Sequence, residues 1–449
     1  ARIEAMNHKG PALGAVIEVN PDALELADQL DKASAKTGLM HGIPVLLKDN
    51  IDTGDKMATS AGSLALEHSH AAKDSAVAAS LRAAGALILG KTNLSEWANI
   101  RSSHSISGWS GRGGFTRNPY ALDRNTSGSS SGSGAAVAAS FCAAAVGSET
   151  DGSVVSPSSV NGLVGVKPTV GLIGGAGIIP ISHSQDTAGP MARTVRDAAI
   201  LLGAMAGGKD YVPFLDAAGL KGARLGVARK FFERNAPMNR FLSQCVEQLR
   251  NAGAEIVDPA DLPSHGKIDG PEIEVLLYEL KADLNAYLAN LPPAAGVKTL
   301  ADVIAFNEKN RGREMPYFDQ ELFLQAEGKG PLTDPKYIQA RADCLRLSRT
   351  EGIDAVLNEH KLDAIVALTN GPAWLIDLVN GDYDTGGCST PAAVAGYPHV
   401  TVPAGLFRGL PVGLSFFSGA NREGQLLKLA YGWEQTAKAR KKPAYLAHI

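Results

Sequence analysis

Short apolar runs alternate with alanine-rich segments of helical length between residues 38 and 208 of this chain. Residues 43–47 and 85–89 have the length and composition of buried strands, whereas residues 74–84 and 132–146 are typical of helices. Strands and helices interleaved in this way build a largely parallel sheet. The segment therefore predicts an α/β fold.

The rest of the 449-residue chain is expected to complete one domain with this core. Residues 213–367 are more charged, have a helical pattern and carry no recognisable motif, so we expect them to cover the site and to set substrate preference. Residues 368–449 return to strands, with VTVPAGL and LPVGLSFF fitting the same sheet. We find no long linker and no repeat of solenoid period.

Composition excludes several classes of function. Hydrophobic residues make up 45% of the chain, charged residues 20%, and the formal net charge is -3, which is typical of a soluble globular protein and predicts no binding of nucleic acid or of an anionic membrane. The longest apolar stretches, such as residues 135–146, are too short to span a bilayer. There is no HExxH motif and no cysteine pair at zinc-ligand spacing, so we expect no metal. The cysteines are expected to be reduced thiols, mostly in the core: Cys142, Cys245, Cys344 and Cys388.

The first residues, ARIEAMN, are typical of a helix already under way, and the sequence lacks an initiator Met. A signal peptide or a first helix can therefore precede Ala1. The expected location is cytoplasmic, or periplasmic or secreted if a signal peptide is removed.

A glycine- and serine-rich stretch, TSGSSSGSG at residues 126–134, is the one low-complexity segment. One interpretation is a flexible linker. However, the stretch runs directly into the apolar segment AAVAASFCAAAV, with no second change of composition. A turn of this kind at a helix N-terminus offers free backbone N–H groups and a positive dipole end. We therefore interpret it as a loop of the functional site.

A nucleotide hydrolase is the main alternative from another class. GALILGKT, at residues 85–92, fits the phosphate-loop pattern, and DTAG, at 186–189, fits its companion. A phosphate loop follows a strand and turns its N–H groups inward. Here residues 86–89 are themselves a predicted strand, which argues against nucleotide binding.

Two further patterns are set aside. GSSSG, at residues 128–132, has the form of a nucleophile elbow centred on Ser130, but the preceding NPYALDRNT is not a strand. An α/β-hydrolase would also need a later Asp and His, for which His360 or His399 could stand in, but no local context marks either. The glycosylation sequon at residues 125–127 matters only in a secretory pathway.

Five blocks occur in order between residues 41 and 193: HGIPVLLKDN, GKTNLSEWA, GSSSGSGAAVAA, ETDGSVVSPSSVNGLVGVKPT and SQDTAGPMAR. Together they resemble the amidase signature family. The resemblance implies the α/β amidase signature fold, with a mixed, largely parallel central sheet covered by helices on both faces, and amide hydrolysis without a cofactor. Phrases such as TNLSEWAN, RGGFTRNPY and GSETDGS most resemble the bacterial peptide amidases, which remove the amide from peptide C-termini.

The resemblance also implies a Ser-Ser-Lys triad. The family's catalytic lysine closes a strand, as Lys48 does in GIPVLLKDN, and its nucleophile lies in a turn that corresponds to TDGSV, which gives Ser153. The bridging serine, held by a cis peptide, is the first Ser of GSSSG, Ser129, which is 24 residues before Ser153, the family's usual interval. A surface lysine ending a strand and a serine in a flexible loop are the plain alternatives for Lys48 and Ser153.

The chemistry supports these residue types independently. An amide is a poor electrophile with a poor leaving group, so a hydroxyl nucleophile must lose its proton as it attacks and the departing nitrogen must gain one. Lysine titrates near about 10.4, but burial can lower its pKa by several units. Lys48 on a buried strand end can thus accept, through Ser129, the proton of Ser153.

The remaining assignments concern the surroundings of the triad. Because glycine permits close approach, the backbone of Thr150, Asp151, Gly152 and Ser153 is predicted to form the oxyanion hole. Ser130 is expected to hold the turn or touch substrate, and Trp109 and Phe115 either line an apolar pocket or belong to the core. Three residues of the TNLSEW block are expected to be structural, and one carboxylate to fix the SQDTAGP turn: Asn93, Ser95, Trp97 and Asp186.

One departure leaves the polarity of the pocket open. The common family form has Arg two residues after the nucleophile, where this chain has Val155, followed by Ser156. The predicted function is hydrolysis of small or C-terminal peptide carboxamides by a monomer or homodimer. Alternatives are an amidase of aryl or fatty amides, an amidotransferase component that works with partner chains, and a non-catalytic binding protein, although no triad residue is lost.

Overall fold

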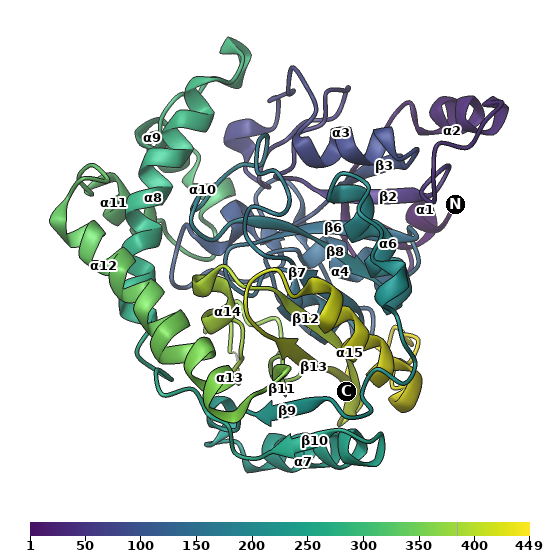
Figure 1. Ribbon diagram of the computed structural model, residues 1–449. Helices are drawn as coiled ribbons and strands as arrows, with labels where there is room; N and C mark the ends of the chain where they lie inside the picture. The colour runs from purple at the N-terminus through teal and green to yellow at the C-terminus, as the bar shows by residue number, and fades with distance from the viewer. Residues whose placement is uncertain (384) are drawn as a thin grey trace.

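The computed structural model of the protein describes residues 1–383 and 385–449. Within these residues, eleven strands form one sheet (Figure 1). In spatial order they are β1 (Val16–Val19), β3 (Leu87–Thr92), β2 (Pro44–Lys48), β6 (Ala144–Glu149), β8 (Thr187–Ala192), β7 (Val164–Lys167), β12 (His399–Phe407), β13 (Leu410–Phe417), β11 (Ala364–Leu368), β9 (Arg224–Val227) and β10 (Glu255–Val257). A separate ribbon pairs β4 (Trp109–Ser110) with β5 (Gly114–Phe115).

The sheet is mixed, and its parallel pairs lie toward its two ends. β3, β2 and β6 run parallel to one another, as do β11, β9 and β10. Antiparallel pairs connect β6 through β8, β7, β12 and β13 to β11, and β1 joins β3 antiparallel. The α/β fold with a mixed sheet, expected from the sequence, is confirmed.

Helices cover both faces of the sheet. On β2, Leu46 packs with α4 (Ser131–Ala138), whereas Val45 and Leu47 belong to the larger cluster formed with α3 (Ala76–Ala83), α6 (Val195–Met205) and α15 (Glu423–Ala437). This alternation follows from the two-residue period of a strand. Lys48, the last residue of β2, is fully buried.

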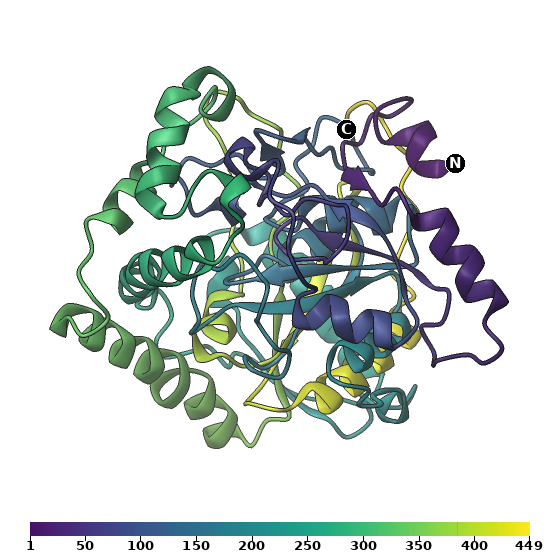
Figure 2. The same ribbon diagram turned by 90° about the horizontal axis from the view of Figure 1, so that it is seen from above.

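A group of helices forms a flank beside the sheet (Figures 1 and 2). α8 (Asp269–Ala289) packs against α11 (Glu321–Glu327) and α12 (Pro335–Leu345), with apolar clusters of its own. The other α-helices are α1 (Arg2–Met6), α2 (Ala23–Lys32), α5 (Val155–Val160), α7 (Ala236–Asn251), α9 (Leu300–Lys309), α10 (Arg311–Glu314), α13 (Asp354–His360) and α14 (Thr390–Ala395). Short 3-10 segments lie at Leu64–Leu66, Glu96–Asn99, Val212–Phe214, Lys230–Phe232 and Pro293–Ala295, and a π-helical turn lies at Arg346–Ile353.

Two expectations about local structure require correction. The predicted helix at residues 132–146 ends at Ala138, and Ala144 begins strand β6, because the small residues of this segment are compatible with both structures. A turn with Ser140 at a positive φ of 59° separates the two. The segment 213–367, expected to be a helical cover, also supplies β9, β10 and most of β11 to the sheet.

Other expectations are confirmed. The four cysteines are free and buried, and the VTVPAGL and LPVGLSFF segments form β12 and β13. None of the helices in the described part of the chain has the length and apolar character that crossing a bilayer requires.

The small side chains of α4 are required by close packing. A Cβ atom on Gly132 would lie 2.2 Å from the carbonyl oxygen of Ala15 and 2.5 Å from that of Asn93. Both neighbours are backbone atoms and cannot rotate away. The serine loop at the start of α4 is thus held directly against β1 and the end of β3.

We predict that Gly132→Ala lowers the free energy of unfolding by about 3 kcal/mol or more, the upper end of what overpacking costs. The matched control is Gly270→Ala on α8, where a Cβ would meet nothing within 4 Å; it should change stability by no more than about 1 kcal/mol. Urea unfolding of both variants measures the difference. Equal stability of the two variants would contradict the packing described for α4.

Candidate active site

Lys48 is delivered into the interior by the end of β2, and its side chain is fully buried. Its Nζ atom lies 2.7 Å from Ser129 Oγ, 2.9 Å from Ser148 Oγ and 3.1 Å from the carbonyl oxygen of Ser148. Burial lowers the pKa of Lys48 to about 7, against the opposing charges of Asp186 and Glu149. The amino group is therefore substantially neutral near neutral pH.

Ser148 and Asn50 hold the lysine in this position. Asn50 Nδ2 donates to Ser148 Oγ at 2.9 Å, so this hydroxyl has a fixed donor on one side and Lys48 on the other. A neutral amine has two N–H groups and one lone pair. With its two N–H groups directed to the hydroxyl and carbonyl of Ser148, its lone pair is left for the hydroxyl of Ser129.

Ser129 lies in the serine loop, after a cis peptide bond between Gly128 and Ser129. Its carbonyl oxygen accepts a hydrogen bond from Ser95 N at 3.1 Å, and its side chain is fully buried. A Cβ on Gly128 would lie 2.1 Å from Ser95 Oγ, so this position has no room for a side chain. The loop is thereby fixed with the Ser129 hydroxyl against Lys48.

The turn that contains Ser153 adjoins this loop. Ser130 N donates to the carbonyl oxygen of Ser153 at 3.2 Å, and Ser130 Oγ contacts both the backbone nitrogen and the carbonyl oxygen of Ser148, each at 3.2 Å. Ser153 is 9% exposed, whereas Ser129 and Lys48 are 0% exposed. The structure thus brings the three segments together and leaves Ser153 the most accessible of the three residues.

Backbone N–H groups gather in this turn. Glu149 accepts from Val154 N at 2.7 Å and from Val155 N at 3.0 Å, which anchors the start of α5. Within the described residues, the N–H groups of Asp151, Gly152 and Ser153 donate to no acceptor. Gly152 has a φ of +74°, a conformation that favours glycine. Three consecutive unpaired donors beside a hydroxyl can stabilise an oxyanion.

Asp186 holds the start of the turn that contains Ser153. One carboxylate oxygen accepts from Thr150 Oγ1 at 2.6 Å, and the other accepts from Ile181 N at 2.7 Å and Ser182 N at 3.0 Å. Burial raises the pKa of Asp186 to about 6. The expectation that Asp186 ties down the SQDTAGP turn is confirmed.

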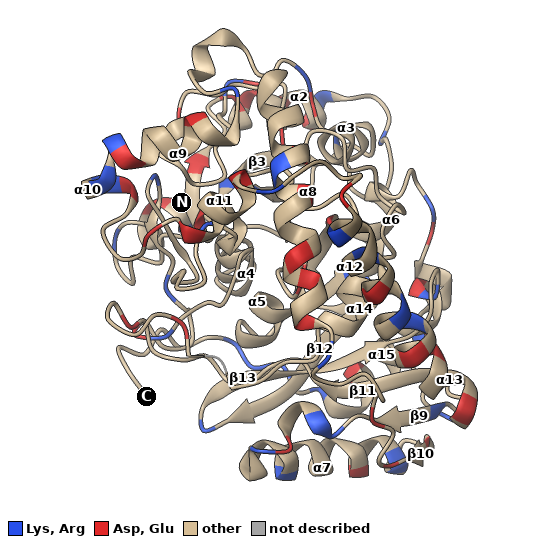
Figure 3. Cartoon of the chain, turned by 90° about the vertical axis from the view of Figure 1, so that its left-hand side faces the viewer, with Lys and Arg blue, Asp and Glu red and all other residues tan. Residues whose placement is uncertain are grey.

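Helix α8 presents acidic side chains (Figure 3), and two of them hold residues 182–184, directly before Gln185 and Asp186. Glu279 accepts from Ser182 Oγ at 2.5 Å and from Ser184 Oγ at 2.6 Å, and Asp283 lies 2.8 Å from His183 Nδ1. His183, Glu279 and Asp283 have a spacing that could hold a metal ion. Hydrogen bonds to the serines and to Tyr337 already occupy the oxygens of Glu279, so the group serves to dock α8 on the turn.

Gln185 connects α8 to the turn that contains Ser153. Its Nε2 lies 2.8 Å from Glu272 Oε1 and 3.2 Å from the carbonyl oxygen of Thr150. In a trans peptide the N–H points away from the C=O. Gln185 therefore directs the N–H of Asp151 to the opposite side of the Thr150–Asp151 peptide.

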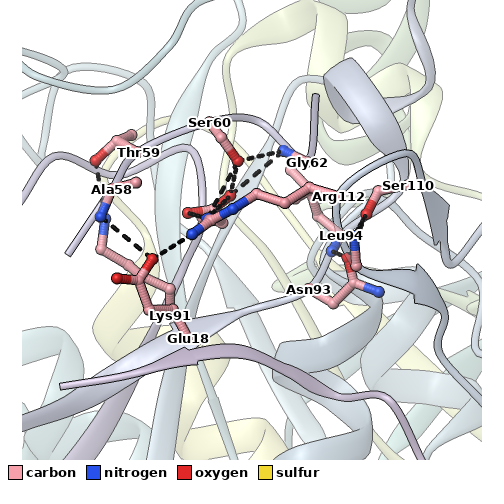
Figure 4. Close-up of polar contacts among 12 residues, drawn as sticks. Glu18, Ala58, Thr59, Ser60, Gly62, Lys91, Asn93, Leu94, Ser110 and Arg112 are labelled. Atoms are coloured by element: carbon pink, nitrogen blue, oxygen red, sulfur yellow. Dashed lines mark hydrogen bonds and ion pairs between the residues drawn. The ribbon is translucent and has the colours of Figure 1, made fainter. Parts of the chain in front are cut away.

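A buried network fixes the chain that follows Lys48 (Figure 4). Arg112 bridges Glu18 and Asp49, with its Nη1 at 3.4 Å from the Asp49 carboxylate. Lys91 Nζ donates to the carbonyl oxygen of Ile51 at 2.7 Å and to Thr59 Oγ1 at 2.9 Å. Residues 49–59 are thus held at both ends, and Lys48 has no freedom to withdraw from the site.

Comparison with known proteins agrees with this geometry. The profile of the amidase family matches residues 1–427. The chain belongs to this family. A probable amidase of Arabidopsis thaliana is 41% identical, with 99% of this chain and 87% of that protein covered. The native peptide amidase of Stenotrophomonas maltophilia superposes with a TM-score of 0.94 at 48% identity, covering 99% of this chain and 93% of that one. A glutamyl-tRNA(Gln) amidotransferase component from Gloeothece citriformis is 33% identical over 97% of this chain and 92% of its own length.

This amidase is an amide C–N hydrolase, and the competing motifs have other roles in it. GALILGKT does not form a phosphate loop, because Gly90, Lys91 and Thr92 continue strand β3 and the Lys91 side chain is buried. Ser130 is held by Ser148. His399 lies on β12 and contacts Ser415 Oγ at 2.6 Å, so it does not serve Ser130 as a base.

The aromatic residues proposed for a pocket pack with each other. Trp109 and Phe115 pair across the β4–β5 ribbon, and the ring of Trp109 meets Tyr317 at 5.5 Å and Phe318 at 5.2 Å edge to face. Within the described residues, neither contacts the triad. Asn93 contacts Gly14, Gly114 and Thr116. Ser95 Oγ accepts a hydrogen bond from Gly108 N, and Trp97 packs in the core with Phe323. The structural role expected for Asn93, Ser95 and Trp97 is therefore confirmed.

Sequence reasoning missed four residues of the site: Asn50, Ser148, Gln185 and Glu272. Asn50 ends the quoted block HGIPVLLKDN, two residues after Lys48, and Ser148 directly precedes Glu149 on β6; the pairing of β2 with β6 brings the two together. Glu272 and Gln185 are 87 residues apart, and no local pattern signals their contact.

Proposed function

We propose that the amidase hydrolyses the C-terminal amide of peptides, with Ser153 as nucleophile, Ser129 as proton relay and Lys48 as base. The observation that carries this proposal is the 2.7 Å contact between the buried Nζ of Lys48 and Ser129 Oγ, in a loop hydrogen-bonded to the Ser153 turn. A base with a pKa near its operating pH is the most effective.

In the first half of the reaction, Ser153 Oγ forms a bond to the amide carbon as its proton passes to Ser129 and the proton of Ser129 passes to Lys48. The oxyanion is stabilised by the N–H groups of Asp151, Gly152 and Ser153. When the tetrahedral intermediate collapses, the C–N bond breaks and the nitrogen takes a proton back through Ser129, leaving as ammonia. In the second half, water loses a proton by the same route as its oxygen bonds to the acyl carbon; the bond between that carbon and Ser153 Oγ then breaks, and Ser153 regains its proton from Lys48 through Ser129 as the acid leaves.

The surroundings of the nucleophile favour a peptide over an aryl or fatty acyl group. Ser156, three residues after Ser153, contacts Ser127 Oγ and Asn370 Nδ2, each at 2.7 Å. Asp151, two residues before Ser153, accepts from Thr390 Oγ1 at 2.6 Å. Polar side chains thus occur shortly before and shortly after Ser153 in the sequence. The likeness to a peptide amidase supports the same substrate class.

We expect ammonia release from an N-acetylated peptide amide to exceed release from benzamide and from a fatty amide by about tenfold or more in kcat/KM. The assay uses the protein alone, because an amidotransferase component would need its partner chains. Ser153→Ala and Lys48→Met should each lower kcat by about 10⁴-fold or more, and Ser129→Ala should lower it severely. Ser243→Ala, an exposed serine on α7, is the control. A preference for benzamide or the fatty amide would assign a different acyl group, and full activity of Ser153→Ala would refute the triad.

The pH dependence follows from the sign of the Lys48 shift. Only neutral Lys48 accepts a proton, so kcat/KM should rise with pH, about tenfold per unit below about pH 7, and level off above it. Burial raises the pKa of Asp186 to about 6, and this residue contacts Thr150. Asp186→Asn therefore tests whether Lys48 or Asp186 causes the rise of kcat/KM with pH. Because the charge of Asp186 raises the pKa of Lys48, a rise that Lys48 sets should persist in this variant and move to lower pH, whereas a rise that Asp186 sets should disappear. An apparent pKa close to that of free lysine would contradict the assignment.

A further inference from the structure

Three charged residues with fully buried side chains, Glu96, Arg101 and Glu314, form one group, which we name the Arg101 cluster. Arg101 Nη1 lies 2.6 Å from Glu96 Oε1, and it donates to the carbonyl oxygen of Glu314, also at 2.6 Å. The guanidinium carbon lies 4.3 Å from the ring centre of Phe318 and 5.6 Å from that of Trp109, which is a cation–π arrangement. Buried charges persist where they are paired in this way. None of the three residues takes part in the proton transfers proposed for the triad.

Two carboxyl groups share the single guanidinium of the Arg101 cluster. A Cβ atom on Gly111 would lie 2.6 Å from Glu314 Oε2 and 2.9 Å from Glu96 Oε2, so these two oxygens are neighbours. Burial holds the pKa of Glu96 well above its usual range, against the charge of Arg101. Neighbouring buried carboxyl groups retain one proton between them. The pair thus acts as one carboxylate and one carboxylic acid, which balances the charge of Arg101.

Glu96 and Arg101 flank a turn with an unusual backbone conformation. The φ angle is +49° at Trp97, +53° at Ala98 and +72° at Asn99. The left-handed conformation is unfavourable for residues that have a side chain, and such residues usually adopt it singly. Three in succession persist only where the surrounding structure holds them. The ion pair between Glu96 and Arg101 joins the two ends of this left-handed turn and so closes it.

The left-handed turn lies against the serine loop. Ser95, directly before the turn segment, donates its N–H to the carbonyl oxygen of Ser129 at 3.1 Å, and Ser129 Oγ lies 2.7 Å from Lys48 Nζ. A Cβ atom on Gly128 would lie 2.1 Å from Ser95 Oγ and 3.2 Å from Asn99 Nδ2. The Gly128–Ser129 peptide is therefore in contact with both ends of the turn. A change in the turn displaces the Ser129 hydroxyl relative to Lys48.

Glu314, the last residue of α10, connects the left-handed turn to the helical flank. Its Oε1 atom accepts from Ser63 Oγ at 3.1 Å and from Leu64 N at 2.6 Å. The carbonyl oxygen of Ala61, in the same segment, accepts from Trp97 N at 2.9 Å. Glu314 thus supports the turn from two directions, through the guanidinium and through residues 61–64.

We propose that the Arg101 cluster positions the proton relay: it holds the left-handed turn against the serine loop and so keeps the Ser129 hydroxyl at Lys48. The inference rests on the proposed function, because that function makes Ser129 the relay. Within residues 1–383 and 385–449, no member of the cluster makes a hydrogen bond or an ion pair with residues 150–153. Loss of the cluster should therefore impair proton transfer and leave substrate binding intact.

The principal test removes the carboxyl group of the flank with Glu314→Ala. We expect kcat for a peptide amide to fall by about tenfold or more while KM changes by less than about twofold, because a displaced catalytic group slows the chemical step. The rate constant for fluorophosphonate labelling of Ser153 should fall together with kcat. The amplitude of labelling should remain complete, whereas a smaller folded fraction would lower the amplitude.

Two further variants separate positioning from general stability. Glu314→Gln keeps an acceptor for Ser63 and Leu64 and places an amide N–H where the acid of the pair carries its proton, so kcat should stay within about threefold of the wild type. Ala98→Gly, added to Glu314→Ala, removes the cost of a left-handed conformation and should raise kcat by about threefold or more.

Glu321→Ala on α11 is the matched control. Glu321 accepts hydrogen bonds from Ser102 and Ser103, so it joins the flank to the same stretch of chain but lies outside the left-handed turn. Its removal should leave kcat unchanged. Melting temperatures check that each variant is folded. If Glu314→Ala does not fold, Glu314→Asp, which withdraws the carboxyl group from Arg101, takes its place with the same expected direction.

Wild-type kcat in Glu314→Ala would overturn the proposal, as would a loss that Glu314→Gln shares and Ala98→Gly does not restore. Ser129→Ala reports separately on the proposed function. If Ser129→Ala loses activity while Glu314→Ala keeps it, the positioning role alone is refuted. If Ser129→Ala keeps full activity, the relay and its positioning are both refuted. If another amide is the better substrate, the same comparison is made with that amide.

Discussion

The site depends on an amino group buried without a carboxylate partner. Lys48 is fully buried, and its Nζ contacts hydroxyl groups and a carbonyl oxygen, while no carboxylate of the described residues lies within ion-pair distance of it. Because a charged amine would be poorly solvated there, the neutral form is favoured. The surrounding structure maintains this state. Asn50 and Ser148 orient the amine, and the network around Arg112 and Lys91 secures the chain that follows it.

Contacts from several distant segments meet at the Thr150–Ser153 turn, the proposed place of acylation. Asp186 accepts a hydrogen bond from the Thr150 hydroxyl of this turn. Gln185, which contacts Glu272 on α8, donates to the Thr150 carbonyl oxygen. The helical flank therefore does more than cover the sheet, because Glu272 of α8 holds Gln185 against the peptide that carries a predicted oxyanion donor. Differences in this flank between relatives are thus expected to change the rate of amide hydrolysis, because the contact of Gln185 with Thr150 depends on it.

The sequence predicted the parts of the structure that are written in contiguous residues. The α/β fold, the strand that ends at Lys48, and the serine loop before α4 each have a local signal. The prediction was wrong where a local signal is ambiguous: the alanines of residues 144–146 suit a helix as well as strand β6, and the short strands β9 and β10 are hidden among charged helices. Contacts between distant segments, such as that of Glu272 with Gln185, could not be predicted, because they arise from packing of the flank on the sheet.

The central claim is that burial of Lys48 activates Ser153 through Ser129. Intact-mass analysis after brief exposure to a fluorophosphonate, followed by peptide mapping, tests it most directly, because the reagent reports nucleophilicity without requiring the correct amide. We expect one adduct, located on Ser153, absent in Ser153→Ala and formed much more slowly in Lys48→Met. An adduct on Ser130, or labelling of Ser153 at an unchanged rate in Lys48→Met, would contradict it.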